Sequence, residues 1–272
     1  MAKRKKYNKK LYFIIAVASL VIVLAFAFIF RRPIIYYSKI VYHKVFLKGN
    51  KQQAFISRPT NLNGEIFVPD AEVFGIDISR HQGFINWNKL AKFKFSYHRI
   101  DFVYIKATES DYWSDNSFQR NWDKAKKKGF YRGAYHFFDP QKNAQEQMNK
   151  FFDIVHLQSG DLPPMLDVEK ESTLSTKEYR KRALNCLLLM QQHYHIKPIL
   201  YINQNFYKAY FSSPEFDNYP LWISRLSKKM PKQKNWVFWQ FTHTAIVSGI
   251  DEFVDLNAFN GSALDFKLLL KP

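Results

Sequence analysis

Cysteine is nearly absent from the 272-residue chain, because Cys186 stands alone, and one cysteine cannot form an internal disulfide framework. No cluster of His and Cys has the spacing of a zinc site, and no glycine-rich phosphate loop follows an apolar run. Acidic residues are scarce in the first 69 positions, which hold 13 Lys or Arg and one Asp or Glu. The sequence therefore predicts no metal and no cofactor.

Positive charge is in excess, but most of it lies outside the part that looks globular. Of the net charge of +18, residues 1–69 carry +12 and residues 70–272 carry +6. A nucleic-acid-binding domain concentrates basic charge in its folded part, so we expect no nucleic-acid partner. Aromatic residues make up 18% of the chain, which is too apolar for a disordered protein.

The longest apolar run, Leu11–Phe30, contains 20 residues without a charge. As a helix it would measure about 30 Å, the thickness of a bilayer core. We predict a basic cytoplasmic tail at 1–10 and a transmembrane anchor at 11–30, with the bulk of the chain on the extracytoplasmic side. The alternative is a cleaved signal peptide, whose apolar core is usually shorter and ends at a small-residue site.

Residues 31–69 are interpreted as a juxtamembrane stalk and linker, and residues 70–272 are interpreted as one catalytic domain. This domain is long enough to bury a sizeable core without disulfides. Helical signals occur at 86–95, 115–128, 141–156 and 176–195, the last beginning with the capping-box spacing of Ser175 and Glu178. An Asp139-Pro140 pair precedes the third stretch and marks its start.

Short runs rich in β-branched and aromatic residues are predicted to be strands. The first five alternate with helical stretches, which favours parallel strands joined by crossover helices. The later gaps are short and contain Pro and Gly. We expect five βα units and then three strands that close a modified TIM-like barrel, the last of which can run antiparallel; an open doubly wound sheet is the alternative. The predicted strands are 74–79, 101–108, 131–138, 163–169, 198–203, 221–224, 236–241 and 253–259.

Four carboxylates fall near the ends of these strands. Asp167 and Glu169 are two residues apart on the fourth strand and share a face. Asp77 lies late in the first strand and Asp255 lies in the last, so closure of the barrel would bring them together. Functional groups of parallel barrels gather at the carboxyl ends of the strands. We therefore expect all four side chains at one mouth.

Carboxylates that share a partly dry site raise one another's pKa, so Glu169 could keep its proton near neutral pH and act as an acid. Hydrolysis of a glycosidic bond needs such an acid, together with a second group that stabilises the reacting centre. A magnesium or calcium site, or a salt-bridged loop, would use the same residue types. Spacing alone leaves these alternatives open.

A series of motifs, each weak by itself, occurs in one order over residues 73–260. The motifs are Phe74–Gly83 with Ile85–Trp87, Phe102–Glu109, Gly133–Phe138, Leu162–Glu169, Leu221–Ile223, Trp239–Phe241 and Val254–Asn257. Together they resemble glycoside hydrolase family 25, the N-acetylmuramidases or lysozymes of the Chalaropsis and Cellosyl type. The resemblance implies a barrel of five βα units and three further strands, and hydrolysis of the β-1,4 bond between N-acetylmuramic acid and N-acetylglucosamine in peptidoglycan.

By position in these motifs, Glu169 is implied to be the general acid and base. Asp167 would assist, as nucleophile or by orienting the acetamido group of the substrate, with net retention. The remaining catalytic residues, Asp77 and Asp255, would shape the electrostatics and hold sugar hydroxyls. Residues expected to line the substrate groove are Tyr135, Tyr201, Trp222, Trp239, Gln240 and Glu109.

Several of these residues have a structural alternative. Glu109 could instead form an ion pair with Lys106, and either tryptophan could pack in the core rather than stack on a sugar. His136 alternates with Tyr135 along a strand, so only one of the two can point into the barrel, and we interpret His136 as a core residue. Cys186 lies in an apolar helical stretch and is interpreted as a buried, inert thiol.

Two positions depart from the family pattern: Arg80 stands where histidine is frequent, and Ser110 stands where glycine is common. They bear on subsite preference rather than on the chemistry. The favoured hypothesis is a membrane-anchored peptidoglycan hydrolase that acts in cell-wall remodelling or turnover. The alternatives are a non-catalytic wall tether on the same fold and a hydrolase of another N-acetylated glycan.

Overall fold

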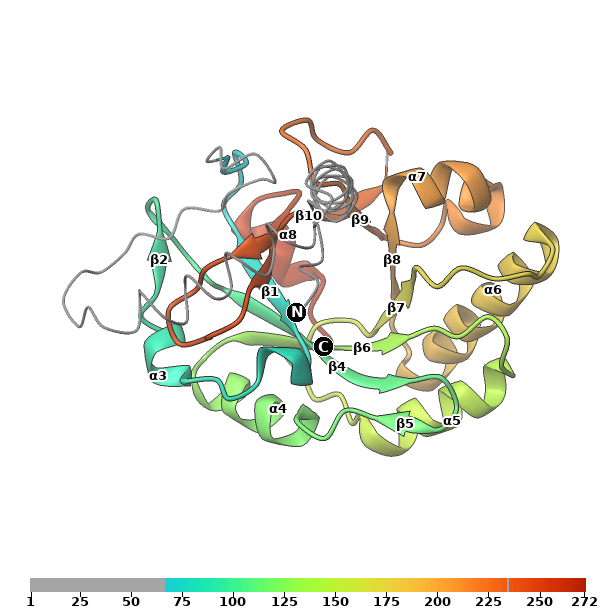
Figure 1. Ribbon diagram of the computed structural model, residues 1–272, viewed down its shortest axis with the longest axis horizontal. Coiled ribbons are helices and arrows are strands. Elements are labelled where there is room, and N and C mark those ends of the chain that lie inside the picture. Colours follow the sequence, from blue (N-terminus) through green and yellow to red (C-terminus); the bar gives the residue numbers. More distant parts are fainter. Residues whose placement is uncertain (1–66, 234) are drawn as a thin grey trace, which may run out of the picture. The chain divides into compact units, whose positions relative to one another are not determined.

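The computed structural model describes residues 67–233 and 235–272 (Figure 1). The predicted tail at 1–10 and anchor at 11–30, and nearly all of the stalk at 31–69, lie outside the described residues. Within the described part of the chain, no helix is long and apolar enough to cross a membrane.

An eight-stranded barrel forms the centre of the domain (Figure 1), and each of its strands overlaps one of the predicted runs. The order around the barrel is β1-β11-β10-β9-β8-β7-β6-β4, and the pairing of β1 with β4 closes it. This closure excludes the open doubly wound sheet. The strands are β1 (Phe74–Ile78), β4 (Phe102–Glu109), β6 (Tyr131–Phe137), β7 (Met165–Val168), β8 (Ile199–Asn203), β9 (Leu221–Ser224), β10 (Trp236–Ala245) and β11 (Val254–Phe259).

Helices accompany only the first part of the barrel, as the sequence predicts. The three long ones, α4 (Phe118–Lys127), α5 (Ala144–Ile154) and α6 (Thr176–Tyr194), each connect two parallel strands along the outside of the barrel (Figure 1). Between β8 and β9 there are only short helical turns: α7 (Gln204–Phe206), η3 (Tyr207–Phe211) and η4 (Pro214–Phe216). Of the last three strands, only β11 is antiparallel to its neighbours. A final helix, α8 (Ala263–Leu268), follows β11.

The prediction of one helix over 86–95 is wrong. A one-turn helix, α3 (Trp87–Leu90), follows the 3₁₀ turn η2 (Arg80–Gln82) and leads into a hairpin of β2 (Lys94–Phe95) and β3 (His98–Arg99). Phe93 and Phe95 are buried on either side of the exposed Lys94, which is the two-residue period of a strand rather than the period of a helix. The hairpin turns at Ser96, whose φ is 53°.

One helix boundary differs from prediction, and one short strand was not predicted. The N-cap of α5 is Asn143, whose side chain accepts from the backbone of Gln145 and Glu146, whereas Asp139 accepts from Gln141 N in the turn before it. A short strand not predicted from the sequence, β5 (Trp113–Ser114), pairs antiparallel with the end of β4. Ser175 caps α6 by accepting from Glu178 N, as the capping-box spacing predicts.

Aromatic rings fill the barrel interior, and two strand glycines make room for them. Tyr104 lies 4.9 Å from Trp222 between ring centroids, and Phe102 lies 5.0 Å from Phe238. A Cβ on Gly75 would come within 2.3 Å of the Phe102 ring, and one on Gly133 within 2.3 Å of Tyr104. Strand glycines are entropically costly, and here their cost is offset by the large rings that they admit.

We expect Gly75→Ala to destabilise the domain by at least about 1–3 kcal/mol, because the added methyl overpacks the Phe102 ring. Urea unfolding followed by tryptophan fluorescence measures the change. The double variant Gly75→Ala with Phe102→Leu should lose less stability than the two single variants added together, because leucine vacates the space. Strict additivity would contradict this account of the glycine.

Candidate active site

A cleft of about 270 Å³ opens at the carboxyl ends of the parallel strands, and all four predicted carboxylates line it. Asp77 comes from β1, Asp167 from β7, Glu169 from the residue after β7, and Asp255 from β11. The sequence-based expectation that barrel closure gathers these side chains at one mouth is therefore confirmed in its geometry.

The antiparallel pairing of β1 with β11 brings Asp77 and Asp255 together. The two residues are directly opposite each other in the register of β1 and β11. Their carboxyl groups interact by a hydrogen bond, and the pKa of Asp255 is raised well above its ordinary value, first by burial and then by the charge of Asp77. Asp255 is therefore the member of this pair that keeps a proton to the higher pH.

Asp77 is fixed by amide donors from two other strands. Asn257 Nδ2 donates to Asp77 Oδ2 at 2.8 Å, and Gln240 Nε2 donates to the same oxygen at 3.4 Å. The Gln240 carbonyl in turn accepts from Tyr201 OH at 2.9 Å and from Ser224 Oγ at 2.7 Å. Burial raises the pKa of Asp77, and these amide donors partly offset that increase.

Asp167 and Glu169 enter the cleft from the same face of the chain, while Leu166 and Val168 pack outward in the core between the barrel and its helices. Asp167 is buried and its Oδ1 atom has no hydrogen-bond partner. Its pKa is raised well above the ordinary value by burial and then by the charge of Glu169. An unpartnered, buried acceptor that faces a cleft is a place for a ligand to donate a hydrogen bond.

Glu169 stands at the rim, where its side chain is exposed. Partial withdrawal of its carboxyl group from water raises its pKa, and the charge of Asp77 raises it further. Lys106 acts in the opposite direction on both Asp167 and Glu169. The cleft therefore retains a proton among its carboxyl groups to a higher pH than free side chains would.

Glu109 does not line the cleft; it forms the predicted alternative, an ion pair with Lys106 at 2.7 Å. The Lys106 ammonium also lies over two rings, 4.4 Å from the centroid of Phe137 and 5.4 Å from that of Trp113. These contacts hold a nearly buried cation against the acidic cleft. Lys106 is thus a cleft residue that the sequence analysis considered only as a partner for Glu109.

Tyr135 and His136 point to opposite sides of β6, as their alternation predicts. Tyr135 faces the barrel interior and lines the cleft together with Tyr201. His136 is fully buried outside the barrel, where Nδ1 lies 2.7 Å from Thr108 Oγ1 and Nε2 lies 3.1 Å from Gln147 Oε1. Burial lowers the pKa of His136 to about 4, so this core histidine is neutral.

The prediction that Trp222 and Trp239 contact substrate is wrong in this structure, because neither presents a ring face to the cleft. Trp222 is 0% exposed inside the barrel and donates Nε1 to Asn257 Oδ1 at 3.1 Å. Trp239 is 1% exposed outside the barrel and donates Nε1 to the Arg225 carbonyl at 2.8 Å. Both are core residues, and Trp222 acts on the site indirectly by orienting Asn257.

Asn257 is a functional residue that the sequence analysis missed. It lies two residues after Asp255, so the two-residue period of a strand places both on one face, and this signal could have revealed it. Cys186 is buried with a raised pKa, in agreement with an inert thiol. Within residues 67–233 and 235–272, no three His, Cys, Asp or Glu side chains are grouped to hold a metal ion.

Residues 76–250 match the model of glycosyl hydrolases family 25. The chain belongs to this family. The predicted enzyme class, a lysozyme-type glycoside hydrolase, is thereby confirmed. The family match ends before Asp255 and Asn257, and the pairing of β1 with β11 is what joins them to the matched residues.

The chain is also similar to individual curated proteins and solved structures. The chain is 38% identical over 192 residues to the uncharacterized protein YegX of Escherichia coli (strain K12), covering 70% of each chain. It is 29% identical over 207 residues to lysozyme M1 of Streptomyces globisporus, covering 70% of this chain and 69% of the relative. A crystal structure of the bacterial lysozyme from Streptomyces coelicolor shares 28% identity with a TM-score of 0.66, and the match covers 75% of this chain and 99% of that one.

We expect Asp255→Asn to make the domain more stable at pH 7, since a pKa that is higher in the folded than in the unfolded chain lowers stability once the pH exceeds the unfolded value. The folded protein holds the Asp255 proton to a higher pH than the unfolded chain does. Wild-type stability therefore falls as pH rises from the ordinary value of 3.8 through the raised one. Asparagine keeps a donor toward Asp77 and has no proton to lose.

The stabilisation by Asp255→Asn should shrink toward zero as the pH is lowered to about 3, where Asp255 is protonated in both the folded and the unfolded chain. Urea unfolding of both proteins across this pH range provides the measurement. Asp251→Asn, in the exposed loop before β11, is the matched control and should not change stability with this pH dependence. If Asp255→Asn changed the free energy of unfolding by the same amount at pH 7 and at about pH 3, the assignment of the proton to Asp255 would be contradicted.

Proposed function

We propose that the protein hydrolyses the β-1,4 bond between N-acetylmuramic acid and N-acetylglucosamine in peptidoglycan, with Glu169 as general acid and base. The observation that carries this proposal is the cleft at the strand ends, where Glu169 with a raised pKa stands beside the buried, unpartnered Oδ1 of Asp167. Membership of the family and the similarity to lysozymes of two Streptomyces species support the choice of substrate.

Asp167 is proposed to orient the acetamido group of the muramic acid residue. An amide N–H placed at Oδ1 would satisfy the one buried acceptor that lacks a partner in the described structure. A hydrogen bond to the ionised form lowers a carboxyl pKa. Substrate binding would therefore favour the ionised form of Asp167. The proton that Asp167 and Glu169 compete for would then stay on Glu169, which has to give it to the leaving group.

The proposed reaction runs in two steps with net retention. Glu169 gives its proton to the glycosidic oxygen, the bond from C1 to that oxygen breaks, and the acetamido carbonyl oxygen bonds to C1 while Asp167 holds the N–H. Water then attacks C1, Glu169 takes the proton of this water, and the bond between C1 and the acetamido oxygen opens. Asp77 and Asp255 would hold sugar hydroxyls and keep negative charge beside the developing positive centre.

Glu169→Gln should lower the rate of solubilisation of purified peptidoglycan by at least about a hundredfold, because glutamine cannot transfer a proton. The assay uses residues 55–272, which include the whole of the described domain, and identifies the new reducing ends by reduction and mass spectrometry. Muramic acid ends that are lost in Glu169→Gln are the expected result. Glucosamine ends would overturn the assignment of the bond.

Glu171→Gln is the matched control, because this glutamate is exposed two residues beyond Glu169 and does not line the cleft. Asp167→Asn should also lose activity while still binding glycan. If the wild-type domain binds the glycan and releases no product, the wall-tether hypothesis replaces the hydrolase. Equal rates on chitin-like oligomers would instead favour a hydrolase of another N-acetylated glycan.

We also infer that residues 11–30 anchor the chain in the membrane, with the stalk at 31–69 leading to the catalytic domain on the extracytoplasmic side. The support is the uncharged run of 20 residues between two basic flanks. A membrane-held hydrolase of this kind would act on cell wall that lies close to the bilayer, in remodelling or turnover.

The full chain should stay in the membrane pellet after extraction at high pH and have an intact N-terminus by mass spectrometry. Val21→Arg combined with Leu24→Arg should release it or prevent insertion, because charges at the centre of a bilayer are costly. A wild-type chain recovered in the soluble fraction without residues 1–30 would show a cleaved signal peptide instead.

A further inference from the structure

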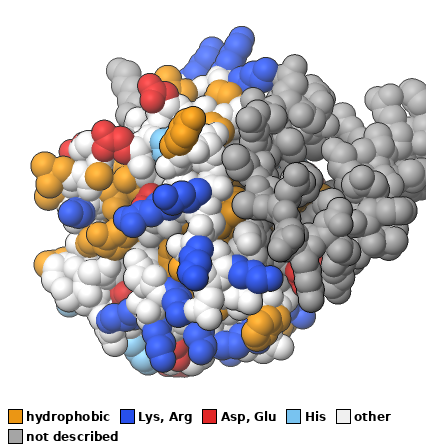
Figure 2. Space-filling model, turned by 90° about the vertical axis from the view of Figure 1, so that its left-hand side faces the viewer, with side chains coloured by type: hydrophobic (Ala, Val, Ile, Leu, Met, Phe, Trp, Pro, Cys, Tyr) orange, Lys and Arg blue, Asp and Glu red, His pale blue; other side chains and the backbone are white. Residues whose placement is uncertain are grey.

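Basic side chains are concentrated on two neighbouring parts of the domain, the segment of α3 with the β2–β3 hairpin and helix α4. Residues 86–101 and 118–130 together hold nine Lys or Arg and two Asp or Glu, a formal charge of +7 against +6 for all of residues 70–272. The rest of the domain is therefore close to neutral. Figure 2 looks onto this side of the molecule and shows Lys and Arg side chains spread across it.

Most of these cations lie at the end of the barrel opposite the catalytic cleft. The hairpin directly precedes β4, and the lysines at the end of α4 directly precede β6, so both groups lie where the strands begin. The hydrogen bond from Tyr131 N to Asp101 O, at 3.0 Å, ties the two groups together. We call this surface the basic end; its residues are Lys92, Lys94, Arg99, Lys124, Lys126, Lys127 and Lys128.

The tip of the hairpin carries an unusually exposed aromatic ring. Tyr97 is 98% exposed, and it stands between Lys94 and Arg99. An aromatic ring flanked by cations is the arrangement found where proteins meet the interface of a bilayer, because the ring suits the headgroup layer and the cations pair with phosphate. No other large hydrophobic side chain among the described residues is as exposed.

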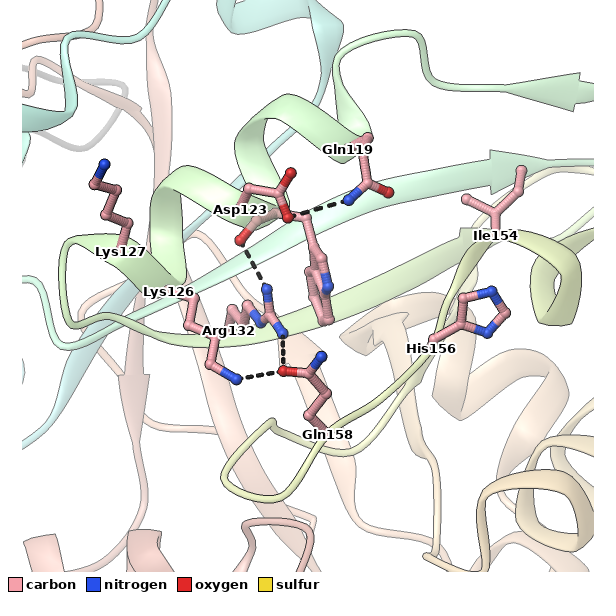
Figure 3. A pocket seen from close by; sticks show the side chains of 9 residues that line it. Gln119, Asp123, Lys126, Lys127, Arg132, Ile154, His156 and Gln158 are labelled. Carbon is pink, nitrogen blue, oxygen red and sulfur yellow. Dashed lines mark hydrogen bonds between the residues drawn. The ribbon is translucent and has the colours of Figure 1, made fainter.

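A surface cleft of about 480 Å³ also opens at this end, between α4, the start of β6 and the segment after α5. Figure 3 shows the Lys126 and Arg132 side chains converging on one oxygen, the Oε1 of Gln158, while Lys127 points away. Arg132 is paired with the buried Asp161 at 2.7 Å, so its charge is already neutralised. Lys126 has no such carboxylate partner among the contacts of the described residues and remains available to an anionic oxygen.

The first described residues of the chain also lie at this end. Phe67, the first described residue, packs against Trp239 and Phe241, and Pro69 to Glu72 line a cleft together with His98 of the hairpin. Asp70 and Glu72 add two negative charges. Together with residues 86–101 and 118–130 they still give a formal charge of +5.

We propose that the basic end binds the anionic lipid headgroups of a bilayer and so orients the catalytic cleft away from the membrane. The partner follows from charge complementarity and from the exposed Tyr97. Strand β4 has eight residues, so its two ends are about 25 Å apart at about 3.3 Å per residue. Docking in this way places the cleft well above the lipid surface. The inference goes beyond the proposed hydrolase function and does not depend on turnover.

Flotation of residues 55–272 with vesicles tests the proposal without the predicted anchor. A match to 75% of this chain covers 99% of the Streptomyces coelicolor lysozyme chain, so a chain of about this extent has a solved structure. We expect binding to vesicles of phosphatidylcholine with 30% phosphatidylglycerol at about 0.15 M salt, little binding to pure phosphatidylcholine, and weaker binding at 1 M salt.

Replacing Lys124, Lys126, Lys127 and Lys128 with glutamine should weaken the binding at least about tenfold. The matched control replaces four exposed lysines elsewhere, Lys177, Lys181, Lys208 and Lys229, and should bind like wild type. Tyr97→Ser should weaken binding several-fold. All three variants should keep wild-type rates on solubilised glycan, which separates a failure of docking from a failure of catalysis.

Three results would overturn the proposal. The first is the absence of binding to the anionic vesicles. The second is an equal loss of vesicle binding in the two lysine variants. The third is that the basic end binds a soluble polyphosphate but does not bind vesicles. The last result would assign the surface to a phosphate-bearing polymer in place of a bilayer. Each outcome is independent of the peptidoglycan assay.

Discussion

The pairing of β1 with β11 is the constraint on which the rest of the site depends. The antiparallel register of these two strands sets Asp77 directly against Asp255. The same register places Asn257 where it donates to Asp77, while Trp222 holds the Asn257 amide from inside the barrel. A shift of one residue would turn these side chains to the other face of the sheet, so fold and site are specified together.

Four carboxyl groups in one cleft work against folding, because burial raises the pKa of each and mutual repulsion adds to the effect. Lys106 is the one Lys or Arg that lines the described cleft, and it is itself held by Glu109 and two aromatic rings. The aromatic interior below the cleft supplies the compensating stability. Tight packing of Phe102 and Tyr104 over glycines thus allows an electrostatically unfavourable site to persist.

The two ends of the barrel have opposite character. Acidic side chains gather where the parallel strands finish, and basic ones gather where they begin. In a βα barrel the loops at the two ends are separate segments of chain, so each end can acquire its own chemistry without disturbing the other. This separation is what lets one domain present a glycan-cleaving cleft and a charged surface in opposite directions.

The sequence by itself determined the eight strands, the change of architecture after Asn203 and the shared face of Asp167 and Glu169, because these follow from local periodicity and spacing. Tertiary structure decided what depends on neighbours distant in the chain. Trp222 and Trp239 are buried core residues, and Glu109 pairs with Lys106 and does not line the cleft. The hairpin at 94–99 replaced a predicted helix because Phe93 and Phe95 are buried against the barrel, and that burial overrides local propensity.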